Sequence, residues 1–202
     1  MIHLIQQWDL AILKLVNHSW QNRLFDEVLP IFRISETWLP LYLFMLVLVI
    51  VNFRKNVLQW FLTAALVPAI TDGISSHIIK ETFYRVRPCR NPDLASWLHV
   101  PQGIYLPMSS SFTSSHATNH FGIAVFFIVT LRPFLGKWVY LLLLWAALIC
   151  YTQLYVGVHY PSDILAGACI GSMLGWGIAR LLNRFFPLGL QQVSAAGNRL
   201  NY

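Results

Sequence analysis

The sequence predicts an all-α, multi-pass transmembrane helical bundle that forms a single domain. Of its 202 residues, 56% are hydrophobic and only 11% are charged, which is too small a polar share to coat a soluble domain of this size. Several apolar runs are long enough to cross a bilayer at about 1.5 Å of rise per residue. Short polar segments separate these runs. We therefore expect an integral membrane protein whose chemistry is confined to those segments.

Five apolar runs are candidate membrane-spanning helices. They cover residues 38–53, 57–79, 119–133, 137–153 and 163–182. The third run is short for a span, and we expect its helix to begin near Ser114, where small hydroxyl residues suit an N-cap. Together the five runs make a transmembrane core over residues 38–182.

Residues 1–33 differ from the five runs. Charged residues such as Asp9, Lys14 and Arg23 interrupt their apolar positions too often for a span, so we expect amphipathic helices that lie at the membrane interface. This segment also lacks the basic start and the uninterrupted apolar stretch of a removable signal peptide. At the other end, residues 183–202 are expected to form a cytoplasmic tail.

The three polar segments of interest are residues 80–88, 111–119 and 155–163. If successive helices alternate in direction, all three lie on one side of the membrane. The loops and tail of the other side carry basic residues without acidic ones, namely Arg54, Lys55, Arg132, Lys137, Arg180, Arg184 and Arg199. The positive-inside rule makes that side cytoplasmic. The polar segments should then face the periplasm, with a bacterial inner membrane as the expected location.

The net charge of +6 suits anionic lipid headgroups. Basic residues are scattered around helix ends and form no patch with interleaved aromatics, which argues against a nucleic-acid partner. The three cysteines show neither a disulfide framework nor metal-ligand spacing, and Cys150 and Cys169 are expected to be small core residues. We predict no metal site and no cofactor, and the sequence leaves the oligomeric state open.

The first polar segment, KETFYRVRP, places Lys80 and Arg87 seven residues apart. If a helix continues as far as Pro88, both cations project from one side, where a point charge and a planar fork could bind a phosphoryl group. The alternative is a pair of interfacial cations that reach toward lipid headgroups.

The second polar segment, SFTSSHATN, precedes an apolar run. A helix that begins there presents unpaired backbone N–H groups and a positive dipole end, which suit an anion. Ser114 and Ser115 could bind phosphate oxygens, with His116 beside them in the first turn. A serine-rich cap with an incidental histidine is the alternative.

The third polar segment, YVGVHYPSD, contains Pro161, which is tolerated at the first position of a helix. Asp163 then lies in the first turn, where the dipole favours its ionised form, within reach of a ring N–H of His159. An imidazole oriented in this way keeps one nitrogen free for attack or proton transfer. The alternative is a histidine that only fills the membrane interface.

Together, the three segments resemble the signature motifs of the type 2 phosphatidic acid phosphatase superfamily, which includes vanadium haloperoxidases and glucose-6-phosphatase. The resemblance covers residues 72–175 in motif order and spacing. The matching residues are Lys80 with Arg87 and Pro88; Phe112 with Ser114, Ser115 and His116; and His159 with Asp163.

The resemblance implies a metal-independent phosphatase that acts on a lipid phosphate or diphosphate in the phospholipid bilayer. His159 would attack phosphorus and form a phosphohistidine, Asp163 would orient it, and His116 would protonate the leaving oxygen. The residues expected to hold the phosphate oxygens are Lys80, Arg87, Ser114 and Ser115. Bacterial undecaprenyl-diphosphate and phosphatidylglycerophosphate phosphatases are similar in size and motif layout.

Two of the motifs depart from the family pattern. Thr113 and Ser115 replace the proline and glycine of the second motif, and Thr152 and Gln153 replace a serine and a phosphate-contacting arginine of the third. Gln153 is still predicted to bind phosphate, but with neutral N–H groups, so Gln153→Arg is expected to tighten vanadate binding. A lipid phosphotransferase and a catalytically degraded lipid-binding relative are alternatives. Haem ligation by paired histidines is another, although it does not explain the nearby Lys, Arg and Asp.

The remaining polar and small residues receive structural roles. Asp72 is expected to bond to a neighbouring helix or to line the floor of the site. Glycines at 167, 171 and 175 recur every fourth residue and predict close helix packing. The residues expected to flank the site or form its rim are His77, His120, Trp97, His99 and Tyr105.

Overall fold

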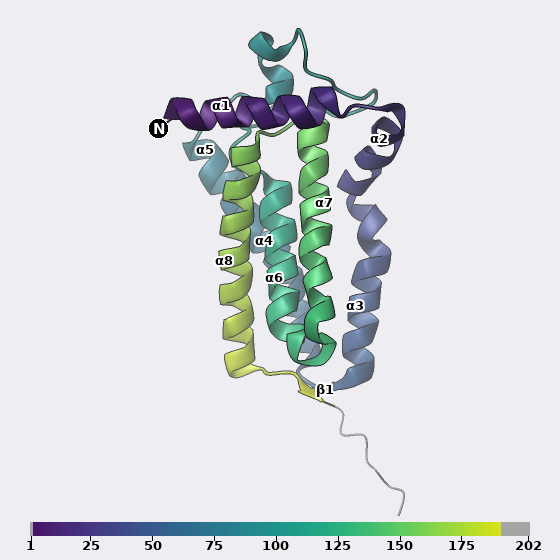
Figure 1. Ribbon diagram of the computed structural model, residues 1–202. Coiled ribbons are helices and arrows are strands. Elements are labelled where there is room, and N and C mark those ends of the chain that lie inside the picture. Colours follow the sequence, from purple (N-terminus) through teal and green to yellow (C-terminus); the bar gives the residue numbers. More distant parts are fainter. Residues whose placement is uncertain (1, 191–202) are drawn as a thin grey trace, which may run out of the picture.

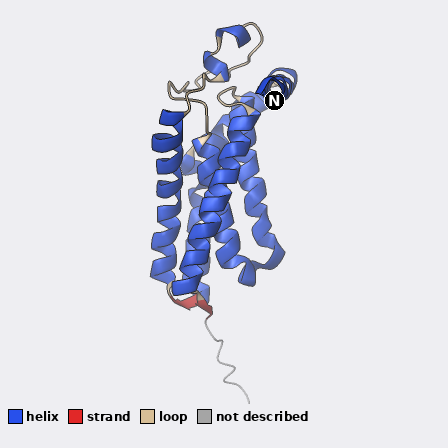
Figure 2. Cartoon of the chain, turned by 90° about the vertical axis from the view of Figure 1, so that its left-hand side faces the viewer, coloured by secondary structure: helices blue, strands red, loops and turns tan. Residues whose placement is uncertain are grey.

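Five long helices stand side by side in the computed structural model, which describes residues 2–190 (Figure 1). They are α3 (Leu39–Asn52), α4 (Val57–Asp72), α6 (Ser115–Leu135), α7 (Leu141–Tyr155) and α8 (Pro161–Phe185). Figure 2 shows that the loops gather mainly at one end of this bundle. The predicted all-α bundle is confirmed.

Four helical stretches are long and apolar enough to cross a membrane, namely Ser35–Asn52, Val57–Thr82, Ser115–Tyr155 and Pro161–Phe185. The third contains both α6 and α7, which run antiparallel on either side of a 3₁₀ turn at Gly136–Tyr140 (Figure 1). Gly136 has a φ of 57°, a conformation that glycine adopts without steric cost. Five helices thus follow the bundle axis, and the chain is an integral membrane protein.

The helix that begins with α4 ends earlier than the sequence suggests. It continues through a π-helical turn, Gly73–Ile79, and stops after α5 (Lys80–Thr82). The expectation that the helix reaches Pro88 is wrong, because Arg87 lies in extended backbone. Hydrogen bonds to a distant loop replace the helical ones: the N–H of Arg85 donates to Ser110 Oγ, and the N–H of Ser111 donates to the carbonyl oxygen of Arg85.

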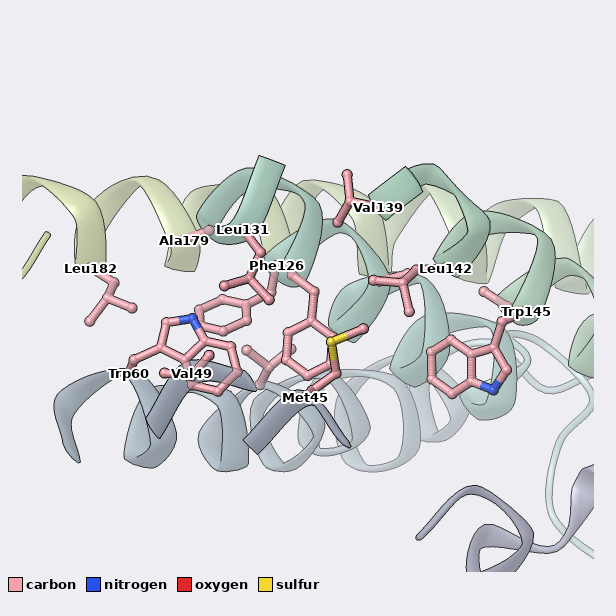
Figure 3. Close-up of a cluster of buried hydrophobic side chains, with 14 of the residues drawn as sticks. Met45, Val49, Trp60, Phe126, Leu131, Val139, Leu142, Trp145, Ala179 and Leu182 are labelled. Carbon is pink, nitrogen blue, oxygen red and sulfur yellow. The ribbon is translucent and has the colours of Figure 1, made fainter. Parts of the chain in front are cut away.

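Aromatic and aliphatic side chains from all five helices fill the interior of the bundle (Figure 3). Trp60 on α4 is 2% exposed, stacks on Phe127 and donates its indole N–H to Thr130 Oγ1 at 3.0 Å. Large apolar side chains on the outer faces are exposed, among them Leu43, Leu58, Leu144 and Leu165. Such a surface suits contact with lipid tails.

The glycines of α8 allow close contact with α6. A Cβ atom at Gly171 would lie 2.1 Å from the carbonyl oxygen of Thr118, and one at Gly175 would lie 2.1 Å from that of Gly122. The packing role predicted for this stripe is confirmed. Because the two backbones touch, the N-terminal ends of α6 and α8 also lie together, and the N–H of Ser114 donates to the carbonyl oxygen of Asp163.

The N-terminal segment covers the loop-rich end of the bundle. Helix α1 (Ile2–Leu13) lies across that end and packs against α8 (Figure 1). A π-helical turn (Lys14–Ser19), α2 (Arg23–Val28) and 3₁₀ turns at Leu29–Arg33 and Ser35–Trp38 lead into α3. Helix α1 exposes Trp8 and buries Asp9, as expected of an interfacial helix.

The long connection from α5 to α6 contains two 3₁₀ turns, Pro88–Arg90 and Pro92–Leu94. It is tied to the N-terminal segment: the Asn17 side chain bonds to both backbone groups of His99, and His99 Nε2 lies 2.8 Å from Asp26 Oδ1. His99 and Trp97, which contacts His18, therefore hold two segments together. Tyr105 is 76% exposed.

At the opposite end, β1 (Phe53–Lys55) pairs with β2 (Gly189–Leu190). Helix α8 extends to Phe185, so the predicted tail begins inside it, and residues 191–202 of that tail lie outside the described residues. Cys150 is buried as predicted. Cys169 is exposed on the outer face of α8, so its prediction as a core residue is wrong. In a membrane-spanning helix, apolar residues also occupy the face toward the lipid, so an apolar position need not be a buried one.

Candidate active site

The three polar segments meet at a cavity of about 240 Å³ at the loop-rich end of the bundle. Six of the eight predicted site residues line it, namely Lys80, Arg87, Ser115, His116, Gln153 and His159. They come from α5, from the extended segment after it, from the start of α6, from the end of α7 and from the turn before α8. The cavity therefore depends on the packing of the whole bundle.

His159 lies in the turn between α7 and α8 and is 3% exposed. Its Nε2 atom is 2.9 Å from Arg87 Nη1. Because a guanidinium only donates hydrogen bonds, Nε2 must accept, and the ring proton belongs on Nδ1. Burial, which disfavours the charged form, lowers the pKa of His159 to about 4. The imidazole is thus neutral at pH 7, and the lone pair of Nε2 accepts the hydrogen bond from Arg87.

Asp163 lies behind His159 and is fully buried. Its Oδ2 atom accepts hydrogen bonds from the N–H of Tyr160 at 2.9 Å and from Ser111 Oγ at 2.5 Å, and its Oδ1 atom accepts from Arg85 Nη1 at 2.6 Å. The distance from Oδ2 to His159 Nδ1 is 3.7 Å, an ion-pair distance that exceeds a hydrogen bond. The Ser111 hydroxyl is also 3.5 Å from His159 Nδ1, so it can link the two side chains.

Arg85 and Asp9 complete this network, and both were missed by sequence reasoning. Arg85 Nη2 is 2.6 Å from Asp9 Oδ2, and Asp9 also accepts hydrogen bonds from the backbone and hydroxyl of Ser162. Burial disfavours the Arg85 charge, but Asp163 and Asp9 outweigh it and raise the pKa. Two features of the sequence could have pointed to them. Arg85 is an additional arginine beside Arg87 in YRVRP, and Asp9 is a carboxylate within an interfacial helix.

Arg87 is held rigidly at the cavity wall. Its guanidinium donates to the carbonyl oxygens of Ser109, Val158 and Ser110, at 2.8 Å, 3.0 Å and 3.0 Å respectively. Burial lowers its pKa, but an arginine keeps its charge at neutral pH. Lys80 Nζ donates to Ser115 Oγ at 2.6 Å. Two positive charges therefore lie in the cavity wall, and because all five N–H groups of Arg87 have protein acceptors, an anion must replace one of those acceptors to bond to it.

Ser114 caps α6 and is fully buried. The Ser114 hydroxyl accepts a hydrogen bond from the N–H of Ala117 at 3.4 Å, and the backbone N–H of Ser114 donates to the backbone carbonyl oxygen of Asp163. The predicted N-cap is confirmed. The structure does not place Ser114 in the cavity wall, so in this arrangement it supports Ser115 and His116 from behind.

His116 lies in the first turn of α6 and faces the cavity. The His120 ring stacks on it with an angle of 7° between the planes, and His120 Nδ1 donates to the His116 carbonyl oxygen at 2.8 Å. His120 also packs on Trp145, so it flanks the site as predicted. His77 is outside the cavity wall, exposed and 4.0 Å from Glu81.

Gln153 is fully buried and turns its amide nitrogen toward its own helix, 3.4 Å from both the Ile149 carbonyl oxygen and Thr152 Oγ1. Its Oε1 atom has no hydrogen-bond partner within residues 2–190. Asp72 accepts from Ser76 Oγ at 3.0 Å and from Asn119 Nδ2 at 3.5 Å. It lines the cavity and bonds to a neighbouring helix, as expected.

Arg33 is a further cation in the cavity wall that sequence reasoning missed. It ends the 3₁₀ turn Leu29–Arg33, immediately before the first apolar run. Its position beside that run was the only signal. In the described part of the chain, His, Cys, Asp and Glu side chains form no group of three that could hold a metal ion.

Comparisons with known proteins show the family of the chain. The family model described as the PAP2 superfamily matches residues 56–187. A lipid A 4′-phosphatase of Bacteroides thetaiotaomicron is 31% identical over 180 residues, which cover 87% of this chain and 77% of the relative. Phosphatidylglycerophosphatase B of Bacillus subtilis is 29% identical over 185 residues, covering 84% and 81%. The solved transmembrane PAP2-type phosphatidylglycerolphosphate phosphatase of Bacillus subtilis superposes with a TM-score of 0.62 at 26% identity, covering 90% of this chain and 88% of that chain.

Proposed function

Because this chain belongs to the PAP2 superfamily, we propose that its cavity hydrolyses a lipid phosphoester through a phosphohistidine formed on His159. The chain is a phosphoester hydrolase of membrane lipids, as its relatives are. One observation carries the proposed mechanism. His159 lines the cavity, and its Nε2 atom is the unprotonated ring nitrogen, 2.9 Å from a guanidinium N–H that can transfer its hydrogen bond to a phosphate oxygen and so free the lone pair for attack.

The proposed reaction has two displacements. First, His159 Nε2 attacks phosphorus, the bond between phosphorus and the leaving oxygen breaks, and protonated His116 gives its proton to that oxygen. A water molecule then attacks the phosphohistidine, His116 takes a proton from it, and the bond between phosphorus and nitrogen breaks. Inorganic phosphate leaves, and both histidines return to their starting states.

The surrounding residues stabilise the charges that develop. While phosphorus is bonded to Nε2, the His159 ring carries positive charge, which the Asp163 carboxylate opposes from the Nδ1 side. Lys80 and Arg87 are positioned before the substrate arrives. All five N–H groups of Arg87 have protein acceptors, so a phosphoryl oxygen replaces one of them, and replacing His159 Nε2 leaves that nitrogen free to attack. No metal ion is needed to supply positive charge in this scheme.

The proposed substrate is a phosphate group on a lipid headgroup. A cavity of about 240 Å³ holds a phosphoryl group and a few neighbouring atoms, so the acyl chains must stay outside it, in the bilayer. The relatives named above are phosphatases of lipid A and of phosphatidylglycerophosphate. We propose a phosphomonoester of this kind and regard a lipid diphosphate as the competing substrate.

A phosphate-release panel tests this proposal. Purified protein in detergent is given phosphatidic acid, phosphatidylglycerophosphate, undecaprenyl diphosphate or lipid A, with His159→Ala as the blank. We expect phosphate release from a monoester, together with an acid-labile phosphoprotein in rapid-quench samples. Transfer of the phosphoryl group to an added alcohol would identify a phosphotransferase. Equal activity in His159→Ala would overturn the mechanism.

We also propose that the cavity faces the periplasm of a bacterial inner membrane. The far ends of α6 and α8 carry Arg132, Arg180 and Arg184, which supports a cytoplasmic position for that end. A cysteine introduced at the exposed Tyr105 in a cysteine-free variant should react with a membrane-impermeant thiol reagent in intact cells. Reaction only after lysis would reverse the orientation.

A further inference from the structure

We propose that Arg33 of the N-terminal segment is a phosphate-binding residue, and that it supplies the charged fork that the third motif lacks at Gln153. The inference rests on the function proposed above, because it concerns the same cavity. It assigns a role in phosphate binding to residue 33, which lies outside the three motifs and outside the region matched by the family model.

Arg33 lines the cavity together with Lys80 and Arg87, and none of the hydrogen bonds or ion pairs among residues 2–190 includes its side chain. Its Nε atom is buried and has no hydrogen-bond partner among residues 2–190. A buried donor without a partner is costly, especially when it is charged. Such a group is explained if the partner is the ligand of the cavity.

The acidic residues on either side in sequence do not neutralise Arg33. Glu36, the nearest, is exposed and forms no ion pair with Arg33 among the described residues. Asp26 bonds to His99 and to the hydroxyl of Tyr155, and Glu27 pairs with Arg23. None of the ion pairs within the described residues includes Arg33. Its inward position is therefore not the result of a structural salt bridge.

The charge balance of the cavity favours an anionic ligand. Arg33, Lys80 and Arg87 line it, and among the described residues Asp72 is the one carboxylate in its wall. Burial and then repulsion by Arg87 lower the pKa of Arg33. A dianionic phosphoryl group that enters between the cations attracts each of them, and this attraction offsets both the cost of burial and the repulsion between the arginines.

Gln153 has a buried acceptor without a partner, as Arg33 has a buried donor without one, among the described residues. Its Oε1 atom is a buried acceptor without a partner in residues 2–190, while its amide nitrogen faces its own helix. In this orientation the amide offers no donor to a phosphate, but its oxygen can accept from a guanidinium in the same cavity. A glutamine at this position therefore tolerates Arg33, whereas an arginine would add a fourth cation beside it.

The presence of Arg33 changes the effect expected of Gln153→Arg, which the sequence predicted to tighten vanadate binding. Gln153→Arg alone should not tighten vanadate binding, because its guanidinium would compete with Arg33 for the same space and charge. In an Arg33→Gln background, the same substitution should restore a single guanidinium to the site. The two positions are thus expected to show strong coupling in a double-mutant cycle.

The experiment measures inhibition by vanadate, a phosphate mimic, and kcat and KM for the preferred lipid. The proteins are the wild type, Arg33→Gln, Gln153→Arg and the double variant. Arg33→Lys keeps the charge without the fork, and Arg23→Gln removes an exposed arginine of the same segment as the matched control. Thermal stability is recorded for every protein.

Arg33→Gln should weaken vanadate inhibition and kcat/KM by roughly ten- to hundredfold, as expected for a charged hydrogen bond. Arg33→Lys should lie between it and the wild type, Arg23→Gln should match the wild type, and the double variant should recover most of the loss. Arg33→Gln within twofold of the wild type, or a loss accompanied by lower stability and not recovered in the double variant, would overturn the role of Arg33. Absence of both phosphate release and vanadate binding in the wild type would instead refute the proposed function.

Discussion

Arg85 forms an ion pair with Asp163 directly behind the proposed nucleophile, with 2.6 Å between Nη1 and Oδ1. The other side of the same guanidinium pairs with Asp9, at 2.6 Å. Asp9 belongs to α1, so the helix that crosses the end of the bundle is joined through one arginine to the carboxylate that faces His159. This network lies outside the cavity wall, and we regard Arg85 and Asp9 as positioning residues.

Arg85→Gln should leave two buried carboxylates without their cation and cost roughly 3 kcal/mol or more of folding stability. Adding Asp9→Asn removes one of those charges, so the double variant should regain stability. The value of kcat should stay low in both, with a smaller change in KM, because Asp163 has lost its partner. Denaturation and kinetics in detergent measure the two effects. Arg90→Gln, which changes an exposed arginine, is the control, and a normal kcat in Arg85→Gln would exclude a positioning role.

His159→Ala should abolish turnover, because it removes the only nitrogen proposed to attack phosphorus. Asp163→Asn keeps the shape of the side chain but removes the charge that opposes the phosphohistidine, and should lower kcat roughly a thousandfold or more. Phosphate release by the purified variants checks both. His77→Ala changes an exposed histidine outside the cavity and should stay within twofold of the wild type. Substantial turnover in His159→Ala would assign the nucleophile to another residue.

The buried state of His159 predicts a pH dependence of stability. Its pKa is lowered from the ordinary value of 6.5 to about 4, so the unfolded chain binds a proton in a pH range where the folded protein does not. The stabilisation is complete above pH 6.5 and is lost as the pH falls toward 4, by roughly 3 kcal/mol from this group. His159→Asn removes the titrating group. The stability difference between the two proteins should change across this window, and parallel curves would contradict the lowered pKa.

Gly171→Ala should separate α6 from α8, because the added Cβ would lie 2.1 Å from a backbone oxygen that cannot rotate away. We expect a loss of roughly 3 kcal/mol or more, seen as a lower melting temperature in detergent. Gly177→Ala on the same helix has no atom within 4 Å of its added Cβ. It should be neutral or slightly stabilising, since alanine is the better helix former. Equal effects of both substitutions would argue against the close packing.

Chelation should not affect the reaction. In the proposed site Lys80 and Arg87 supply the positive charge that a metal ion supplies in other phosphatases. Phosphate release should therefore be the same after dialysis against EDTA as before it. Loss of activity that added zinc or magnesium restores would show that the roles of these two residues are wrong.

The parts of the fold that follow local rules were predictable from sequence. Apolar run length predicted the crossing helices, Ser114 was recognised as an N-cap, and Pro161 marked the start of α8. The end of α5 was not predictable, because hydrogen bonds from Arg85 to residues 110 and 111 replace helical ones. Local pattern carries no information on such distant partners.

The same distinction applies to the site. Motif residues could be recognised because their order and spacing are local. Arg33, Arg85 and Asp9 could not, because each acquires its role from contacts with segments far away in sequence, such as the 76 residues that separate Asp9 from Arg85. Gln153 lines the cavity, but the direction of its amide group depends on the packing of α7 and could not be inferred from sequence.

The glycine contact between α6 and α8 divides the site into a fixed half and an adjustable half. The spacing between His116 and His159 is set by two touching backbones, so it should be the same whatever lipid is bound. Arg33 and the residue 88–110 connection lie outside this helix contact, and side chains such as Asn17 and His99 tie the connection to the N-terminal segment. Exchange of those segments between relatives should therefore change which headgroup is accepted while the distance between the two histidines is inherited unchanged.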